Sequence, residues 1–587
     1  MTEEKKEKKE KPSVETIRHS LSHILAAAVL EMFPEAKLGI GPAIENGFYY
    51  DFDLPRTLIP EDLTILEDKM KKIIAADYSF DRKKEPKAEA IKFLEKAGQP
   101  YKIELAGELK DDEVGFYEIK NDEGKILFVD MCAGPHVEST KFLRSSGFKL
   151  DKTAAAYWRG DEKNSMMQRI YSLAFESRDE LKNYEQMMAE AAKRDHRKLG
   201  KELGLFVFSD LVGPGLPLYT PKGTILRNNI ANYSRELRAK IGYQEVQTPN
   251  MNKAELFKIS GHYDKYKDDM FEVHSHYTEE EYYLKPMNCP QHTQIFASAP
   301  RSYKDLPIRI ADMAVLYRDE KPGELSGLTR LRAFCQDDGH CFCREDQIKE
   351  EFIAVLSVIR EAMTRYGMNY DIRLSLRDES KKEKYLGSDE VWVKSQKMLR
   401  ELLEDEKIDF VISEGEAAFY GPKMDLLAKD SLGREWQLST IQLDFNMPGR
   451  FNLEYITEDG SKKTPVMIHN AIVGSPERFM GVLIEHYAGA FPVWLAPIQA
   501  RILPIADRHF EYARKIRKEL SDAGIRVELD DRTESVGRKI REAEMQKIPV
   551  MLVIGDKEIE SGKVALRKYK EGDRGQVEIQ EVVKSLK

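Results

Sequence analysis

The sequence predicts a multidomain protein that combines α+β and α/β domains. Its 587 residues suggest about three or four domains, and its composition, 41% hydrophobic and 33% charged, is that of ordinary globular proteins. The central part mixes amphipathic helices with β-rich segments such as 308–318 and 435–445, which indicates an α+β domain with an antiparallel sheet. The last part follows a βαβαβ order, which predicts a small α/β domain with parallel strands.

The elements expected along the chain divide it into successive parts. A helix over 13–33, which starts at Pro12 and Ser13 and ends before Pro34, opens a first domain of helices and short strands. Residues 178–203, rich in Glu, Lys, Ala and Met, predict one long linker helix. The expected boundaries are 1–12 for a charged, disordered tail, 13–176 for the first domain, 177–203 for the linker, 204–497 for the α+β domain and 498–587 for the α/β domain.

Charge, hydropathy and cysteine usage exclude several classes of protein. The net charge of −9 argues against non-specific coating of nucleic acid, although local basic patches still allow RNA binding. The apolar stretch 24–30 is far shorter than the ~20 residues that span a bilayer, so we expect no membrane partner. Five cysteines without a disulfide framework, in a chain with no visible signal peptide, favour reduced thiols and a cytoplasmic location.

Two pairs of metal-ligand residue types lie in the first domain. His19 and His23 are four positions apart on the first expected helix and therefore share one face. Cys132 and His136 are also four apart, just after the β-like run 126–131. Nitrogen and sulfur donors of this kind are the set that zinc prefers. The same groups can act as acid/base and positioning groups without an ion, so both interpretations stay open.

A second constellation is rich in arginine. Arg318 and Arg330 flank a glycine-bearing loop, and we expect them to project from paired strands onto one face. Two guanidinium groups suit a polyphosphate, because arginine binds phosphate oxygens bidentately and stays charged. Phe334 is placed to stack on a base, and Arg478 lies in the first turn of an apolar helix. The alternative for 317–338 is a salt-bridged surface hairpin.

Cys289, His340 and His469 form a third candidate set. Cys289 lies at a proline-flanked turn, His340 follows Gln336-Asp-Asp-Gly, and His469 ends a strand-like run. Their spacing cannot show that they meet. As isolated residues, each is more often a satisfied core group than a metal ligand.

These residues together resemble the threonyl-tRNA synthetases, a family of class II aminoacyl-tRNA synthetases, over nearly the whole chain. The three class II motifs are similar to 222–249, 318–332 and 474–479. Stretches that match the threonine-specific family are 287–290, 336–340, 419–423, 440–445 and 467–469. The resemblance implies a class II catalytic domain with an antiparallel sheet, an editing domain before it and an anticodon-binding domain after it.

The resemblance also implies a threonine–tRNA ligase that activates threonine with ATP and transfers it to the 3′-terminal adenosine of threonine tRNA. One Zn²⁺ per subunit would be held by Cys289, His340 and His469, and Mg²⁺ would accompany ATP. Implied ATP contacts are Arg318, Glu320, Arg330, Phe334, Gln437 and Arg478. Implied threonine contacts are Met287, Gln336, Asp338, Tyr420, Gln442 and Ser475. The arginines Arg318, Arg330 and Arg478 would be catalytic, and His262 would assist transfer.

A zinc ion that binds the threonine hydroxyl can reject valine but not serine, so a second, editing site is expected. A site that binds a hydroxyl rejects an analogue without it, such as valine, by ~10⁴ or more, whereas the methyl group that serine lacks is worth only ~1–3 kcal/mol. The family's editing domain, shared with alanyl-tRNA synthetases, hydrolyses seryl-tRNA with ordered water and not with a metal. Its implied residues here are His19, His23, Tyr50, Lys102, Asp130, Cys132 and His136.

The remaining implications concern partners. Glu558 and Arg567 match family positions that read anticodon bases, and the family forms homodimers through the catalytic domain. We expect a form without the small ubiquitin-like domain that begins many bacterial members. The alternatives are an inactive synthetase-like paralogue that binds tRNA or regulates translation, and a protein that acts only as a tRNA deacylase.

Overall fold

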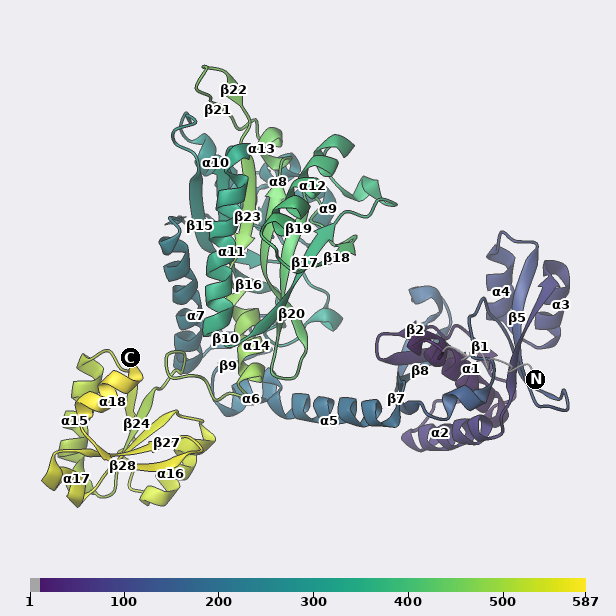
Figure 1. Cartoon of the computed structure of the whole chain (residues 1–587), viewed down its shortest axis with the longest axis horizontal. Coiled ribbons are helices and arrows are strands. Elements are labelled where there is room, and N and C mark those ends of the chain that lie inside the picture. Colours follow the sequence, from purple (N-terminus) through teal and green to yellow (C-terminus); the bar gives the residue numbers. More distant parts are fainter. Residues whose placement is uncertain (1–10) are drawn as a thin grey trace, which may run out of the picture. The chain divides into compact units, whose positions relative to one another are not determined.

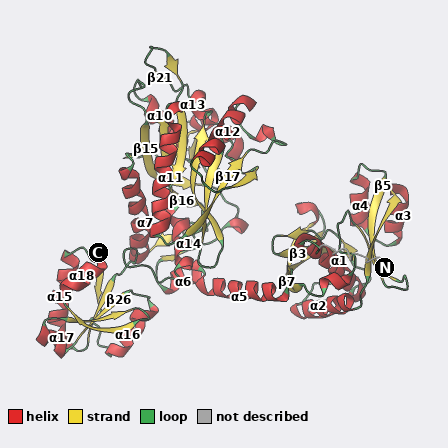
Figure 2. Cartoon of the chain, in the orientation of Figure 1, coloured by secondary structure: helices red, strands yellow, loops and turns green. Residues whose placement is uncertain are grey.

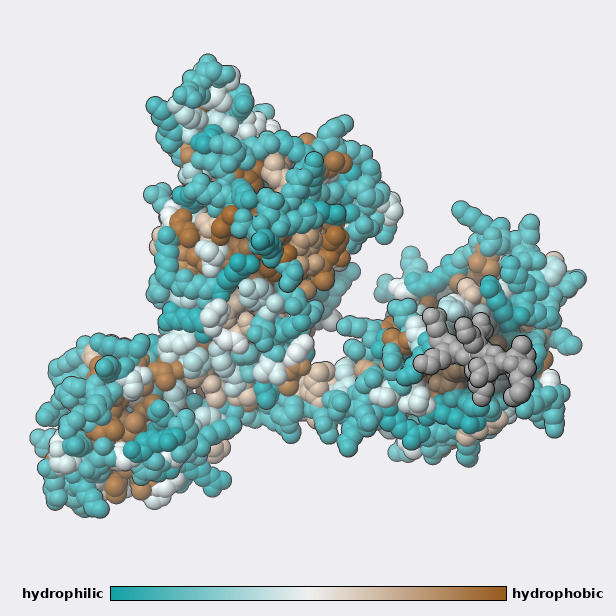
Figure 3. Space-filling model, in the orientation of Figure 1, coloured by the Kyte–Doolittle hydropathy of each residue, from teal (hydrophilic) through white to brown (hydrophobic). Residues whose placement is uncertain are grey.

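The computed structural model describes residues 11–587, so most of the predicted tail over 1–12 lies outside the described residues. The chain forms two compact units, one that ends at Ala189 and one that begins at Glu190 (Figure 1). Hydrophilic residues cover most of the face seen in Figure 3, as expected when apolar side chains fill the interior. Within residues 11–587, no helix combines the length and the apolar character needed to cross a bilayer.

Helix α1 (Val14–Met32) lies in the core of the first unit. The Ser13 side chain accepts a hydrogen bond from the backbone N–H of Thr16 at 3.2 Å, which caps the helix at its predicted start. One sheet has the order β1-β3-β8-β7, with β2 on β3, and a second has the order β4-β5-β6. The elements are β1 (Lys37–Leu38), β2 (Ala43–Ile44), β3 (Gly47–Asp53), α2 (Pro60–Ala75), β4 (Ser79–Pro86), α3 (Lys87–Lys96), α4 (Pro100–Glu108), β5 (Glu113–Lys120), β6 (Ile126–Met131), β7 (Gly147–Tyr157) and β8 (Met166–Phe175).

The linker is two helices, α5 (Arg178–Arg194) and α6 (His196–Glu202), so the single helix predicted over 178–203 is wrong. Asp195 leaves the helical conformation, with φ −46° and ψ 121°, and its side chain accepts a hydrogen bond from the backbone N–H of Arg197 at 2.8 Å. A short side chain that binds the backbone in this way competes with helix continuation. Asp195 therefore ends one helix and starts the next.

The second unit is built on an eight-stranded sheet of order β11-β15-β16-β23-β20-β19-β17-β18. The strands from β15 to β17 pair antiparallel, as predicted, whereas β11 and β18 pair parallel at the two edges. The strands are β11 (Gln244–Glu245), β15 (Ile308–Tyr317), β16 (Ala333–Cys343), β17 (Asn369–Leu376), β18 (Val411–Glu414), β19 (Lys423–Lys429), β20 (Glu435–Asp444) and β23 (Val466–Ala471). Around the sheet lie β9 (Phe206–Val207), β10 (Leu218–Tyr219), α8 (Ala254–Ser260), α9 (His262–Tyr266), α12 (Asp389–Asp405) and α13 (Met447–Arg450).

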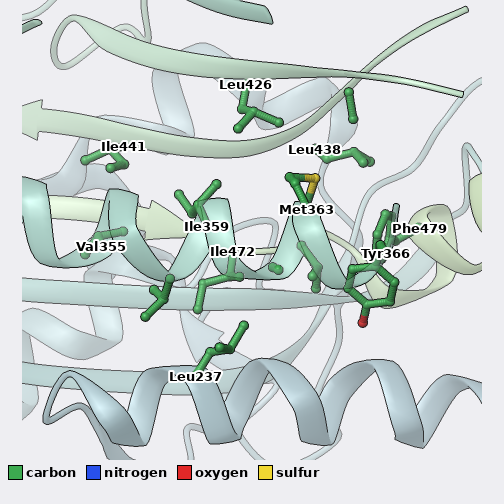
Figure 4. Packing of buried hydrophobic residues seen from close by; sticks show 14 of the residues in the cluster. Leu237, Val355, Ile359, Met363, Tyr366, Leu426, Leu438, Ile441, Ile472 and Phe479 are labelled. Carbon is green, nitrogen blue, oxygen red and sulfur yellow. The ribbon is translucent and has the colours of Figure 1, made fainter. Parts of the chain in front are cut away.

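The two faces of this sheet have different roles, because successive side chains of a strand point to opposite faces. On one face, α7 (Pro221–Lys240), α11 (Ile348–Arg365) and α14 (Pro476–His486) pack with strand residues such as Ile441 in an apolar cluster (Figure 4). The adjacent residue, Gln442, points to the opposite face, which we call the site face. Helix α10 (Cys289–Ala297) packs on that face.

The C-terminal sheet has the order β25-β24-β26-β27-β28. The strands β24 (Ala500–Pro504), β25 (Val527–Leu529) and β26 (Val550–Ile554) are parallel, as predicted. The hairpin of β27 (Val564–Lys568) and β28 (Gly572–Val577) continues the sheet antiparallel, so the sheet is mixed. The helices are α15 (Phe510–Asp522), α16 (Val536–Met545), α17 (Asp556–Ser561) and α18 (Ile579–Leu586) (Figure 2).

Candidate functional site

Cys289, His340 and His469 meet on the site face of the large sheet. Strand pairing places His340 directly opposite His469, and His340 Nε2 lies 3.0 Å from His469 Nδ1. Cys289 is the first residue of α10, and its Sγ lies within 4.8 Å of the ligand nitrogens of both histidines. All three side chains are buried. The fold thus joins residues that sequence spacing could not connect.

The surroundings of these three side chains fit a metal ion. Asp444 Oδ2 lies 3.0 Å from His469 Nε2, and His292 Nδ1 lies 2.7 Å from His340 Nδ1. Outer contacts of this kind orient ligating histidines. Burial lowers the pKa of His340 well below its ordinary value, which keeps the ring neutral, as a ligand must be. One sulfur and two nitrogen donors suit a zinc ion that keeps an open position.

A cavity of about 450 Å³ adjoins this cluster, because Gln442, in its wall, is paired with His469 across the strands. The structure brings most of the predicted nucleotide and amino-acid contacts together in it. Its walls include Arg318, Glu320, Arg330, Phe334, Gln336, Gln437, Gln442, Ser475 and Arg478.

Two guanidinium groups of this cavity carry poorly compensated charge. Arg318 lies over the ring of Phe334, with its Cζ 5.2 Å from the ring centroid, and burial lowers the pKa of Arg318. Arg478 follows the capping residue Ser475 in the first turn of α14. Burial and the nearby charge of Arg330 lower the pKa of Arg478, whose Nε has no hydrogen-bond partner within residues 11–587. Since arginine stays charged at neutral pH, both groups are ready to bind an anion.

Arg318 follows Tyr317, the last residue of β15, and Arg330 lies in the loop before β16, so the expectation that the two arginines project from paired strands is wrong. Its guanidinium donates to Glu320 at 2.8 Å and to Glu324 at 2.6 Å. The Arg330 side chain is long and half-exposed, and its pairing with these two carboxylates stabilises the loop position over a position on a strand. Exposed ion pairs are worth at most about 1 kcal/mol, so a phosphate group can replace them.

Polar groups gather where the cavity meets the candidate metal ligands. Tyr420 stacks on His469 with ring centroids 4.6 Å apart, and its hydroxyl donates to Oε1 of Gln442 at 2.5 Å. Asp338 shares the site face of β16 with His340. Burial raises the pKa of Asp338 to about 7. An ammonium group beside this carboxyl would favour its charged form.

His262 lies against the same cluster at the start of α9. Its Nδ1 is 2.8 Å from Ser260 Oγ, and its Nε2 is 3.0 Å from Met287 Sδ and 3.5 Å from Cys289 Sγ. Burial lowers the pKa of His262 to about 3, so its ring is neutral. His262 and Met287 therefore pack around Cys289, and a role of His262 in group transfer stays a prediction.

The first unit holds a separate cluster of His19, His23, Cys132 and His136, whose ligand atoms lie within 4.8 Å of one another. Cys132 Sγ is 3.2 Å from His19 Nε2 and 3.4 Å from His136 Nε2. Burial lowers the pKa of all three histidines and raises the pKa of the Cys132 thiol. Such a set can hold a metal ion or move protons on a bound water molecule.

Asp130 joins the other predicted residues to this cluster. Its carboxylate accepts hydrogen bonds from the hydroxyl of Tyr50 at 2.5 Å and from Nζ of Lys102 at 2.7 Å. His23 Nε2 lies 3.8 Å from the same carboxylate. A cavity of about 570 Å³ borders His19, so a ligand can reach the cluster. All the predicted editing residues are thus close together.

Glu558 and Arg567 lie in the C-terminal sheet region, but the carboxylate of Glu558 is used inside the fold. It accepts hydrogen bonds from the backbone N–H of Gly555 at 2.9 Å and from Nε2 of Gln576 at 2.7 Å, which caps α17. Arg567 lies 3.9 Å from Asp573, and its Nε has no hydrogen-bond partner in the described part of the chain. Arg567 therefore has the freer hydrogen-bonding groups.

Three further residues belong to the site and were not singled out from the sequence: Asp444, His292 and Lys285. Asp444 follows two positions after Gln442 on the site face of β20, and His292 lies one turn after Cys289 on α10, so strand and helix periodicity were available signals. Lys285 is fully buried and donates to Oδ1 of the neighbouring Asn288 at 2.9 Å. No local pattern predicts the burial of a lysine.

Three family comparisons agree with this geometry. Residues 271–487 match the family described as tRNA synthetase class II core domain (G, H, P, S and T), and residues 499–587 match Anticodon binding domain. Residues 114–171 match the threonyl and alanyl tRNA synthetase second additional domain. The antiparallel sheet with its arginine-lined cavity is the core of a class II aminoacyl-tRNA synthetase.

Individual relatives are more specific. A threonine–tRNA ligase of Gloeobacter violaceus is 48% identical over 579 residues, which cover 97% of this chain and 91% of that protein. One of Rubrobacter xylanophilus is 49% identical over 560 residues, 95% of this chain and 86% of that protein. The solved RNA binding domain of threonyl-tRNA synthetase from Cryptosporidium parvum Iowa II has a TM-score of 0.64 and 39% identity over 67% of this chain and 97% of its own. The chain belongs to the threonine–tRNA ligase family, which confirms the predicted family and fold class.

Proposed function

We propose that this chain activates threonine with ATP, transfers it to the 3′-terminal adenosine of threonine tRNA and hydrolyses seryl-tRNA at a second site. One observation carries the proposal: Cys289, His340 and His469 meet beside a cavity that holds Arg318 and Arg478. The three residues that can bind a metal ion, and through it the hydroxyl of threonine, thus lie beside the two arginines that can bind the triphosphate of ATP. The editing, catalytic and anticodon-binding domains are 13–176, 204–497 and 498–587.

Activation joins the carboxylate of threonine to the α-phosphorus of ATP, and pyrophosphate leaves with the electron pair of the broken P–O bond. Arg318 binds the α-phosphate, and Arg330 and Arg478 bind the distal phosphates. Phe334 and Arg478 hold the adenine ring between them, and Glu320 and Gln437 complete the ATP site. Mg²⁺ would accompany the bound ATP and offset the charge of its phosphates. Charges that are already in position lower the barrier because they need no rearrangement during the reaction.

Cys289, His340 and His469 would hold one zinc ion per subunit. A bound zinc ion would supply open coordination positions for the amino nitrogen and hydroxyl of threonine, and valine lacks that hydroxyl. Tyr420, Gln442 and Met287 surround the amino acid, with Gln336 and Ser475 at the side of the cavity. Asp338 lies beside the amino group, where the positive charge offsets the burial of its carboxyl.

Hydrolysis of seryl-tRNA belongs to the cluster of His19, His23, Cys132 and His136. The neutral histidine rings can accept and return protons of an attacking water molecule, and the thiol can donate a hydrogen bond to it. Lys102 and Tyr50 hold the Asp130 carboxylate in place beside the cluster. We propose that ordered water, and not a metal ion, occupies this site.

The proposal includes a homodimer through the catalytic domain. The support is a group of exposed apolar side chains on the hairpin of β9 and β10: Val207, Phe208, Leu211, Val212 and Leu218. Apolar side chains gathered on a surface mark interaction sites. Arg567 and Glu558 are proposed to face the anticodon, and the five unpaired cysteines suit the reducing cytoplasm.

ATP–pyrophosphate exchange tests the ligase. Zinc-replete protein should exchange with threonine strongly, with serine weakly and with valine hardly at all. Cys289→Ala should lose this exchange, whereas Cys343→Ala, which removes a buried thiol from the opposite face of the same sheet, should keep its selectivity. No exchange by wild-type protein with any of the three amino acids would overturn the proposal in favour of a tRNA-binding paralogue.

A further inference from the structure

A buried histidine of the linker contacts the loop that carries Arg330. His196 is the first residue of α6, and its Nε2 lies 2.9 Å from the backbone nitrogen of Leu328. Its Nδ1 lies 2.7 Å from Glu485 Oε1 on α14. Leu328 is fully buried, so water cannot replace the acceptor that His196 gives to its N–H group.

The partners of His196 determine which nitrogen carries its proton. A backbone N–H can only donate, so Nε2 is the acceptor, and an ionised carboxylate can only accept, so Nδ1 carries the proton. Glu485 is itself held, because it also accepts from the backbone N–H of His196 at 3.0 Å and from Arg434. Both ring nitrogens are therefore in use, and neither is left for a metal ion, although ligand atoms of Asp195, His196 and Glu485 lie close together.

The loop approaches this histidine more closely than a side chain would allow. Gly327 has φ +50°, and a Cβ at this position would lie 2.2 Å from His196 Nε2. On the opposite side, a Cβ at Gly481 of α14 would lie 3.5 Å from the His196 ring. The imidazole thus fills a slot between the loop and α14, and a glycine permits the contact on the loop side.

This contact fixes the part of the loop that forms the cavity wall. Leu328, Thr329, Arg330 and Leu331 all line the cavity, and the turn closes with a 2.9 Å hydrogen bond from Thr329 N–H to Ser326. The guanidinium of Arg330, by contrast, is half-exposed, and in the described chain it is held only by the carboxylates of Glu320 and Glu324. The buried anchor of this turn is therefore the bond from Leu328 to His196.

We propose that His196 is a positioning residue for ATP: it holds the turn 326–331 so that Arg330 reaches the distal phosphates. The inference rests on the proposed function, because it assumes that the cavity takes ATP. His196 itself touches no substrate. It acts through the backbone of Leu328, and Glu485 sets its tautomer.

Two substitutions at His196 should differ in their effect on ATP binding. His196→Asn keeps an N–H donor near the place of Nδ1 but has no acceptor near Nε2, whereas His196→Gln can place its carbonyl oxygen there. We expect the Kd and KM for ATP to rise about tenfold in His196→Asn, because a buried N–H loses its acceptor, and to stay within about twofold in His196→Gln. The KM for threonine should not change in either variant.

Calorimetric titration gives the Kd for ATP, pyrophosphate exchange gives both KM values, and thermal unfolding shows whether each variant is folded. His486→Asn, at the last residue of α14, is the matched control and should bind ATP as wild type does. Equal ATP affinities in His196→Asn and His196→Gln, or an equal rise in the KM for threonine, would overturn the proposal. Wild-type protein that binds ATP without exchange would contradict the proposed function, while the calorimetric comparison would still decide the role of His196.

Discussion

His469 donates a hydrogen bond from Nε2 to Oδ2 of Asp444 at 3.0 Å, which leaves its Nδ1 directed at His340. The other oxygen of Asp444 accepts from the backbone N–H groups of Asn446 at 2.7 Å and Met447 at 2.9 Å. Neither the ring nor the carboxylate can rotate without losing these bonds. The ring orientation that a metal ion needs is therefore fixed by the fold of β20 and α13.

Asp444→Asn should weaken zinc binding about 10- to 100-fold, as changes of such outer partners typically do. The amide cannot hold the His469 ring as the carboxylate does, because it carries no charge. Competition with a chelator, read by elemental analysis of the protein, measures the affinity. Asp430→Asn, a change of another buried carboxylate near the same sheet, is the control and should retain zinc. An unchanged zinc affinity in Asp444→Asn would show that zinc binding does not depend on the charged bond between Asp444 and His469.

Arg238→Ala should lower the free energy of unfolding by about 3–5 kcal/mol, because it leaves a buried carboxylate without its cation. Arg238 Nε donates to Asp337 at 2.6 Å, and the side chains are only 5% and 1% exposed. Arg235 lies one helical turn before Arg238 and forms an exposed ion pair with Glu245. Arg235→Ala should therefore lower the free energy of unfolding by less than about 1 kcal/mol. Denaturant unfolding compares the two variants, and equal losses would contradict the role of burial.

The histidines of the editing cluster should stay neutral at pH values where free histidine is charged. Burial lowers the pKa of His23 well below the ordinary value, and burial lowers the pKa of His136 as well. Below about pH 6.5 the unfolded chain binds protons that the folded chain does not, so stability is complete above that pH and falls by up to about 1.4 kcal/mol per histidine per pH unit below it.

Exchange of the imidazole C2 hydrogen, followed by mass spectrometry across pH 4 to 8 (about the range in which histidine titrates), measures these two histidines separately. The same chain in denaturant provides the reference titration. If the titration midpoints of the two rings in the native protein equalled those in the denatured chain, the rings would become charged in the cluster as they do in free histidine.

Cys132 should act as a donor that positions water and not as a nucleophile. Burial raises the pKa of its thiol, and the thiolate is the reactive form. Cys132→Ser should therefore keep hydrolysis of preformed seryl-tRNA within about tenfold, whereas His136→Ala should lose about 10²-fold or more, as expected for a proton-transfer group. Threonine-dependent exchange should not change in either variant. Equal losses in a single-turnover assay would favour a covalent role for Cys132.

Local signals predicted the features that depend on neighbouring residues. The start of α1 at Ser13 and the place of Arg478 in the first turn of α14 follow from capping bonds over a few positions. The meeting of Cys289, His340 and His469 could not be predicted in this way, because strand pairing joins histidines that are 129 positions apart. The family resemblance supplied that grouping, while spacing left it open.

The errors share a physical cause: a polar side chain found a nearer partner than the pattern assumed. Asp195 caps a new helix and interrupts the predicted linker helix. Arg330 pairs with Glu320 and Glu324 in a loop, although the expected hairpin placed it on a strand. Sequence patterns describe backbone preference and polarity, and they do not rank competing hydrogen bonds.

The row Gln442, His469 and His340 crosses three strands, and each pair is in direct register. A slip of β23 by one residue would bring Ile468 or Asn470 opposite His340 and turn His469 toward the apolar helices. A metal ion held by Cys289 and by the two histidines of this row could therefore stay only on chains whose strands had already aligned correctly. The metal ion would therefore bind only after the sheet has formed, because contacts between residues so far apart in the sequence form late in folding.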